Sequence, residues 1–232
     1  MMEQLLNIAV VMTLCFTAFG GFHLFMHKRG INYVDHYFLV AGYFLSVATL
    51  STLIFWQSII LVLQDFSATP LIVLTLFMFC QIVLYMYLPK YFCESAEYFV
   101  KYPDRYYLKI DWRRLVSKSM DILAQQVFIV LLVLFLQDAG LSLIQIIMAF
   151  TFLFGLLHVP LIAHERGAWP SWLFAGIVVV FSIIFPILIL KVQYGFVYNY
   201  MIHWLFYTVT ATSFQIWYAK RNVSLGSGSR IQ

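Results

Sequence analysis

Long apolar runs, each bounded by polar or charged residues, are the feature of this sequence that most constrains its fold. A helix crosses the hydrocarbon core of a bilayer with about 20 mostly apolar residues, whereas a β-strand needs only about 10. Only helices and closed barrels satisfy every backbone polar group in lipid, so runs of this length predict an all-α polytopic membrane protein with about seven transmembrane helices. The predicted segments are Gln4–Met26, His36–Leu63, Pro70–Leu88, Met120–Leu136, Leu141–Ala163, Ser171–Leu190 and Phe196–Tyr218.

Composition supports the same class. Hydrophobic residues make up 63% of the chain and charged residues only 10%, whereas a soluble domain carries about 25% charged residues. The sequence also lacks a glycine-rich phosphate loop, a Gly-x-Ser-x-Gly elbow and a His-Glu-x-x-His pair. The soluble enzyme classes that these motifs mark are therefore not indicated.

The positions of the basic residues predict the orientation in the membrane. If the N-terminus lies outside, Lys191 is the only one of the 14 Lys and Arg residues on the outer side. Lys and Arg concentrate in cytoplasmic loops, so the sequence predicts an N-out/C-in topology. The net charge of +4 reflects this bias. No basic stretch has the aromatic interleaving of a nucleic-acid surface, so no nucleic acid is expected as a partner.

The chain divides into four predicted parts. Residues 1–92 form transmembrane helices 1–3, residues 93–118 a cytoplasmic interfacial amphipathic connector, residues 119–219 a transmembrane core, and residues 220–232 a disordered tail. The connector is rich in aromatic and charged residues, which suits the headgroup layer, and Pro103 is expected to divide it. Alternatively, the connector forms a lid or a substrate-docking surface over a site that opens toward the cytoplasm.

The first apolar segment has a second interpretation, as a cleaved signal peptide. It lacks a basic start and a small-x-small cleavage site, and it is too long, so we expect a retained helix. Cys15, Cys80 and Cys93 lie within spans or at the inner interface and predict no disulfide framework.

Polar side chains inside the spans are the candidate functional residues, because an uncompensated polar group in lipid costs several kcal/mol. Asp121 and Gln125 are four residues apart and share a helix face with each other. Asn199, His203 and Tyr207 form a second polar stripe at intervals of four. The full set of candidate residues is Asp121, Gln125, Gln126, His158, Asn199, His203 and Tyr207. The fourth, fifth and seventh segments are predicted to meet around a polar cavity faced by Gln125 and His158.

An ordered set of short motifs over residues 119–218 resembles one family. The set is Gln125-Gln126, then Phe154-Gly-Leu-Leu-His158, then His203-Trp-Leu-Phe-Tyr207. It resembles the Glu-Glu, Phe-x-x-x-His and His-x-x-x-Asn motifs of the CAAX protease and bacteriocin-processing (CPBP, or Abi) family. That family of intramembrane proteases includes the type II CAAX prenyl endopeptidases.

The resemblance implies a function and a set of residue roles. By position, Gln125, His158 and His203 correspond to the residues that activate a water, and Tyr207 to the residue that helps bind the oxyanion. Gln126 stands at the second Glu of the family's pair and is counted with the catalytic set. The implied substrate is a membrane-associated peptide or a lipidated protein, and the implied location is a bacterial inner membrane. A divalent metal such as zinc is an open cofactor assignment, with His158 and His203 as its ligands. The lipid bilayer and a further membrane protein are the other implied partners.

The departures from the family pattern keep alternatives open. Gln125 has no titratable carboxylate and can orient a water but cannot take its proton. Val130 stands where the family has an Arg. Asp121, one turn away, could serve as the base if a hydrated cavity reaches it. Three interpretations therefore stay open. The chain is a peptidase whose active site is degenerate, with glutamines that are either natural or introduced in place of glutamates. Alternatively, it is a catalytically inactive scaffold or binding protein on the same fold, or an unrelated transporter or cofactor-bearing membrane subunit.

A further polar set lies near the end of the first segment. His23 and His27 are four residues apart, a spacing compatible with one metal, and His36 follows after a short loop. The simpler interpretation is that all three are interfacial histidines that form hydrogen bonds. A haem or metal site is the alternative.

Overall fold

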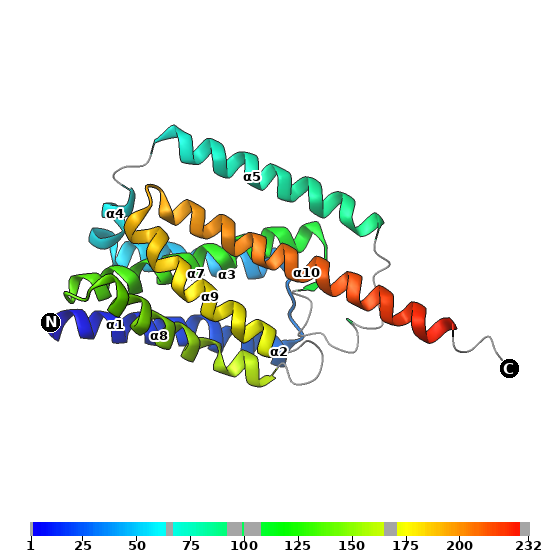
Figure 1. The fold of residues 1–232 in the computed structure, drawn as a ribbon, viewed down its shortest axis with the longest axis horizontal. Helices are drawn as coiled ribbons and strands as arrows, with labels where there is room; N and C mark the ends of the chain where they lie inside the picture. Colours follow the sequence, from blue (N-terminus) through cyan, green and yellow to red (C-terminus); the bar gives the residue numbers. More distant parts are fainter. Residues whose placement is uncertain (1, 64–66, 92–98, 100–107, 165–170, 228–232) are drawn as a thin grey trace. The chain divides into compact units, whose positions relative to one another are not determined.

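The structure is a computed structural model that describes residues 2–63, 67–91, 99, 108–164 and 171–227. Within these ranges every regular element is helical, so the prediction of an all-α fold is confirmed for the described chain (Figure 1). The elements are α1 (Met2–Cys15), η1 (Phe16–Gly21), α2 (Phe22–Arg29), α3 (Tyr37–Ile54), α4 (Trp56–Leu63), α5 (Ala68–Tyr87), η2 (Leu88–Lys90), α7 (Trp112–Asp138), α8 (Leu143–His164), α9 (Ser171–Lys191) and α10 (Gly195–Ser227).

Among the described residues, four helical stretches are long and apolar enough to cross a membrane. They are Met2–Arg29, Tyr37–Ile54, Ala68–Lys90 and Trp112–Asp138, and two shorter apolar stretches are Leu143–His158 and Gly176–Lys191. These lengths and compositions support the classification as a membrane protein.

The first helical stretch contains a π-helical turn at Phe16–Gly21. The hydroxyl of Thr13 donates to the carbonyl of Ala9, and that of Thr17 to the carbonyl of Thr13, each at 2.8 Å. Gly20 and Gly21 follow in the same turn. Short π-helical turns insert one residue into a helix, and here the stretch stays helical from Met2 to Arg29.

The second predicted segment, His36–Leu63, is not one continuous helix. It is divided into α3 and α4 at Phe55, where the Ser58 N–H donates to the Phe55 carbonyl at 3.0 Å. This i to i+3 bond tightens the chain into a turn. Hydropathy alone does not register such a turn, because the residues on both sides are apolar.

Helix α7 begins at Trp112, well before the predicted start at Met120. Asp111 caps it, because its Oδ1 accepts the Arg113 N–H at 2.9 Å. Residues 112–118 are thus helical and continuous with the rest of α7, and Arg114 and Lys118 are buried. Most of the predicted connector lies outside the described residues, so its interfacial role stays a prediction.

Helices α9 and α10 are both long. Pro186 lies inside α9 without ending it. Helix α10 continues to Ser227, into the range predicted as a disordered tail, and the rest of that tail, 228–232, lies outside the described residues.

The chain forms two compact units, each described separately. The first comprises residues 1–22, 49–66 and 125–199. In it α8 and α9 lie side by side (Figure 1). Phe154 packs between Phe150 and Phe185, at ring-centroid distances of 5.2 and 6.0 Å, and the Ser182 hydroxyl donates to the Thr151 hydroxyl at 2.9 Å. Aromatic packing and this one polar contact therefore hold the helix pair together.

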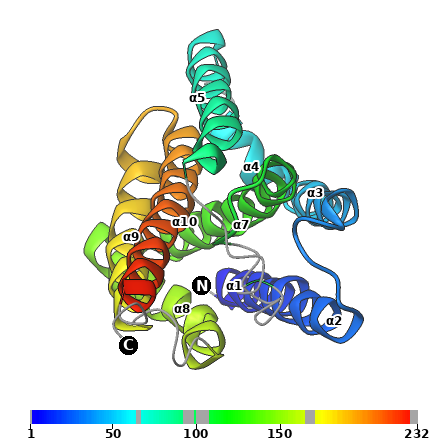
Figure 2. The same cartoon turned by 90° about the vertical axis from the view of Figure 1, so that its right-hand side faces the viewer.

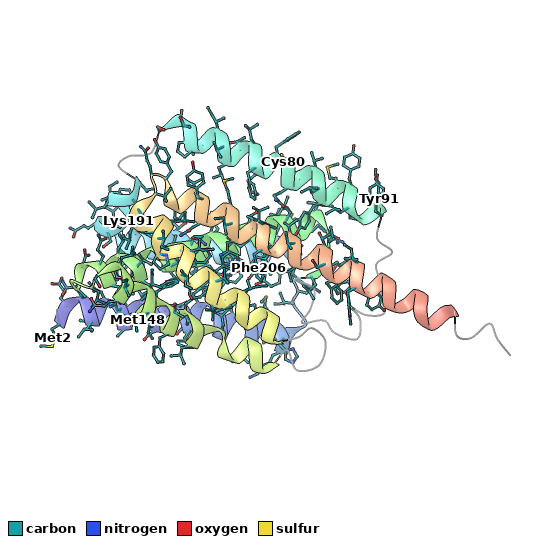
Figure 3. All side chains as sticks on the ribbon, viewed as in Figure 1. Met2, Cys80, Tyr91, Met148, Lys191 and Phe206 are labelled. Atoms are coloured by element: carbon teal, nitrogen blue, oxygen red, sulfur yellow. The ribbon has the colours of Figure 1, made fainter. Side chains whose placement is uncertain are left out.

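The second unit comprises residues 23–48, 67–124 and 200–232. It contains α5 and most of α10, both labelled in Figure 2. The Thr208 hydroxyl of α10 donates to Gln81 Oε1 of α5 at 2.7 Å, and Tyr85 of α5 packs edge-to-face on Trp204 of α10. One buried hydrophobic cluster of this unit contains Tyr85, Ile110, Leu115, Ile122, Tyr200, Trp204 and Ala211. On α5, Cys80 is exposed, as is Tyr91 just beyond the end of η2 (Figure 3).

Candidate functional site

A buried polar stripe runs along the first part of α7, in the second unit. Arg114 and Lys118 are four residues apart, as are Ser117 and Asp121, and the two pairs lie side by side on one helix face. All four are buried, with between 0% and 5% of their surface exposed. Because α7 is one of the candidate spans, these polar groups require partners, and their partners define the site.

The centre of the site is an ion pair between Lys118 and Asp121. Lys118 Nζ lies 2.5 Å from Asp121 Oδ2, and both side chains are almost fully buried. The Tyr33 hydroxyl donates to the same carboxylate oxygen at 3.0 Å. The carboxylate is thus held by a cation and a neutral donor together, an arrangement that favours its ionised form.

Tyr33 comes from the short loop between α2 and α3, and a second bond fixes that loop on α7. The Ser117 hydroxyl donates to the Tyr33 carbonyl at 2.7 Å. Burial raises the pKa of Tyr33 well above its usual value, and the charge of Asp121 together with the hydrogen bond to it acts in the same direction. Tyr33 therefore remains a protonated donor toward Asp121 across the physiological range.

Aromatic rings surround the ammonium group of Lys118. Its Nζ lies 3.9 Å from the ring centroid of Tyr207 and 5.3 Å from that of Tyr33. The His203 ring stacks on Tyr207 with centroids 5.4 Å apart, and His203 is buried. A cation between electron-rich ring faces is favourably placed, and more so where water is excluded.

Three of the residues singled out in the sequence are thus brought together: Asp121, His203 and Tyr207. Lys118 joins them, and sequence reasoning missed it because it was counted among the cytoplasmic loop charges. The signal that could have revealed it is its spacing of three residues from Asp121, which puts both charges on one helix face.

The other predicted site residues belong to the first unit. Gln126 is buried, and Gln125 and His158 are partly buried. His158 contacts its own helix, because its Nδ1 lies 2.7 Å from the Phe154 carbonyl oxygen and its ring centroid 4.4 Å from that of Phe154. The predicted approach of Gln125 to His158, and of both to His203, stays a prediction.

No group of three or more His, Cys, Asp and Glu side chains that could hold a metal occurs within the described ranges. The assignment of zinc to His158 and His203 therefore stays a prediction. In the histidine set of the first half, His23 lies 6.3 Å from the Tyr33 ring, between centroids, and so borders the buried site. His36 Nδ1 accepts the Asn32 N–H at 3.4 Å, which fits the simpler interpretation as a hydrogen-bonding interfacial residue.

A second charged group, nearer to solvent, lies at the start of α7. Arg113 pairs with Asp111 at 2.8 Å and approaches Asp35 at 3.7 Å. Partial burial of Asp111 opposes its ionisation, but the hydrogen bonds and positive charge of Arg113 outweigh this, and the pKa of Asp111 falls below its usual value. This group caps the helix and contributes no reactive base.

Comparisons with known proteins find no match: no family model, no curated protein and no solved structure is similar to this chain. The resemblance to the CPBP family accordingly stays a prediction from motif order.

Proposed function

We propose that this chain is an integral membrane protein with seven spans, N-out/C-in, of a bacterial inner membrane, and that its CPBP-like core binds a membrane-associated or lipidated peptide without cleaving it. The four helices of spanning length support membrane insertion. The basic residues, of which only Lys191 falls on the outer side, support the orientation.

The observation that carries a binding role, as opposed to hydrolysis, is the state of Asp121. It is the one carboxylate in the candidate set, and it already forms an ion pair with Lys118 and accepts from Tyr33. Taking a proton from water would break that pair in a buried setting. Gln125 cannot take the proton either. Losing a general base typically lowers a rate by about 10²–10⁴-fold.

The test measures binding and turnover on the same preparation. Purified protein in liposomes is given a fluorescent farnesylated peptide, and anisotropy reports binding while chromatography reports cleavage. We expect saturable binding with no product. Gln125→Glu tests the peptidase alternative, because it supplies the missing carboxylate, and Gln145→Glu is its matched control at an exposed position of α8. Cleavage by the unmodified chain would refute the proposal, and so would an absence of peptide binding.

One observation favours a second candidate function, that of a proton-coupled transporter. A buried Lys–Asp pair in a candidate span is typical of proton and ion pathways in membrane proteins. Proteoliposomes containing a pH-sensitive dye would report acidification under a potential. Asp121→Asn should abolish such a flux, while Asp138→Asn, at the exposed end of α7, should leave it intact. Absence of flux in the unmodified protein removes this candidate.

A further inference from the structure

Arg114 is the buried charge that the site around Asp121 does not use. It lies in the first turn of α7, and none of its surface is exposed. Its Nη1 donates to the Tyr85 hydroxyl at 2.7 Å and to the Lys109 carbonyl at 3.3 Å. The Tyr85 ring centroid lies 5.7 Å from the guanidinium carbon. One edge of the guanidinium is therefore held firmly in place.

The opposite edge of the guanidinium is buried but unpaired. Nε and Nη2 of Arg114 have no hydrogen-bond partner among the described residues. These two nitrogens lie side by side in the planar group, and their N–H bonds run parallel, which is the geometry that binds two oxygens of one oxyanion. Leaving buried donors of a charged group unsatisfied costs several kcal/mol, so an acceptor at this edge would be strongly favoured.

The charge of Arg114 is also unmatched within the described ranges. In the same region Asp111 pairs with Arg113 and Asp121 with Lys118, and no described carboxylate forms an ion pair with Arg114. A buried cation normally has a counter-charge, because transfer from water is costly for a lone ion. Among the described residues, this absence of a counter-charge favours an anion over a neutral acceptor at the unpaired edge.

The place of Arg114 along the helices indicates what carries that anion. Arg114 is two residues inside the start of one candidate span, and its partner Tyr85 lies near the end of another, Ala68–Lys90. Beyond Tyr85, the exposed Lys90 and Tyr87 are in contact at 4.6 Å, an arrangement typical of the membrane interface. At that level the abundant oxyanions are the phosphates of lipid headgroups.

We propose that the unpaired edge of Arg114, positioned by Tyr85, is a binding site for a phosphate oxyanion carried by the headgroup of an anionic lipid. The site is distinct from the peptide-binding role proposed above and does not depend on it. The phosphate accepts two charge-assisted hydrogen bonds, from Nε and Nη2, and neutralises the guanidinium. Its acyl chains remain in the bilayer beside α5 and α7.

The test uses the full chain in a neutral detergent and three probes: dioctanoyl phosphatidic acid, dioctanoylglycerol with the same chains but no phosphate, and inorganic phosphate. Each is titrated by calorimetry, and the unfolding midpoint is followed in parallel. We expect phosphatidic acid to bind and raise the midpoint, and dioctanoylglycerol to do neither. If inorganic phosphate binds as tightly as phosphatidic acid, the site recognises the free ion and the lipid assignment is wrong. If dioctanoylglycerol binds as well as phosphatidic acid, or if no probe binds, the proposal is wrong.

Variants assign the binding to Arg114. Arg114→Lys keeps the charge but cannot donate two parallel bonds, so the Kd for phosphatidic acid should rise by at least about tenfold, as loss of one charge-assisted bond implies. Arg113→Lys, one residue away and partly exposed, should leave the Kd unchanged. Tyr85→Phe, which frees Nη1 without removing a charge, should weaken binding less than Arg114→Lys does. An unchanged Kd in folded Arg114→Lys overturns the assignment, and the three-probe comparison decides the matter if that variant fails to fold.

Discussion

At the scale of single residues, the buried pair of Lys118 and Asp121 is the most sensitive point of the described chain. Removing one partner leaves the other charge buried, which typically costs about 3–5 kcal/mol of unfolding free energy. We therefore expect Lys118→Met to lower stability strongly, and Lys118→Met combined with Asp121→Leu to recover much of the loss. Unfolding in detergent measures both. If the losses of unfolding free energy in Lys118→Met and in Asp121→Leu alone simply add up in the double variant, the two residues are not energetically coupled.

A matched control exists one helical turn away. Arg113 and Asp111 also form an ion pair, but the Arg113 side chain is 35% exposed. Pairs in contact with solvent contribute about 0–1 kcal/mol, so Arg113→Gln should have a small effect on the unfolding midpoint. Similar losses from Lys118→Met and Arg113→Gln would mean that the first pair is accessible to water.

Tyr33 makes the stability dependent on pH at the alkaline end. Its pKa is raised in the folded chain, first by burial and then by Asp121. A raised pKa stabilises the fold fully below the usual tyrosine value of about 10, and this contribution is lost as the pH rises above it, because the unfolded chain then releases the proton more readily. As the pH rises above about 10, the unmodified protein should therefore lose stability more steeply than Tyr33→Phe.

The measurement compares unfolding midpoints of the two proteins over that range, with Tyr91→Phe as a control at an exposed position. Tyr33→Phe also removes the hydrogen bond to Asp121, so it should be less stable at neutral pH by about 1–3 kcal/mol. Parallel pH curves for Tyr33→Phe and the unmodified protein would show that this hydroxyl does not titrate in a buried setting.

At the scale of elements, the connection between α9 and α10 depends on a close backbone approach. Tyr194 has a positive φ of 61°, and a Cβ placed on Gly195 would lie 1.9 Å from the Leu188 carbonyl oxygen. That atom belongs to the backbone and cannot swing aside. Gly195→Ala should therefore force the turn to shift and lower stability by about 1–3 kcal/mol.

Gly176→Ala is the control for that change. Gly176 lies in α9, and a Cβ there meets nothing within 4 Å. Alanine in an exposed helical position is favoured over glycine by about 0.5–1 kcal/mol, so this variant should be as stable as the parent or slightly more so. Equal destabilisation by both variants, measured by unfolding in detergent, would exclude a local steric cause at Gly195.

The sequence predicted the helices better than their ends. Apolar runs located α5, α8, α9 and α10, because a helix that crosses the bilayer needs about 20 consecutive apolar residues and therefore appears in the sequence as a run of that length. The start of α7 was missed because hydropathy treats Lys118 as a boundary, although Asp121 compensates its charge inside the helix. The division at Phe55 was missed because a turn in an apolar run changes hydrogen bonding without changing polarity.

The same limits apply to the candidate site. Periodicity on α10 related His203 to Tyr207, and the two rings do stack. Periodicity on α7 related Asp121 to Gln125, but the partners of Asp121 are Lys118 on its own helix and Tyr33 from a loop distant in sequence. A contact between residues 88 positions apart leaves no local pattern, so only the structure reveals it.

At the scale of the whole molecule, the property that most determines function is the orientation in the membrane. Only Lys191 among the basic residues lies on the predicted outer side, so an N-out/C-in topology is expected to be strongly preferred. In that orientation Arg114 lies at the cytoplasmic leaflet, where anionic lipids are concentrated, which suits the lipid site proposed for it. The opposite orientation would place the same guanidinium in the leaflet with fewer such lipids.

Single-cysteine labelling in intact cells and in permeabilised cells tests this orientation. After Cys15, Cys80 and Cys93 are changed to serine, Arg105→Cys and Lys191→Cys are each exposed to a reagent that does not cross membranes. We expect Lys191→Cys to be labelled in intact cells and Arg105→Cys only after permeabilisation, because they lie on opposite sides of the predicted topology. Labelling of Arg105→Cys from outside would reverse the topology. Labelling of both from the same side would mean that an even number of spans separates them, contrary to the three expected between the connector and Lys191.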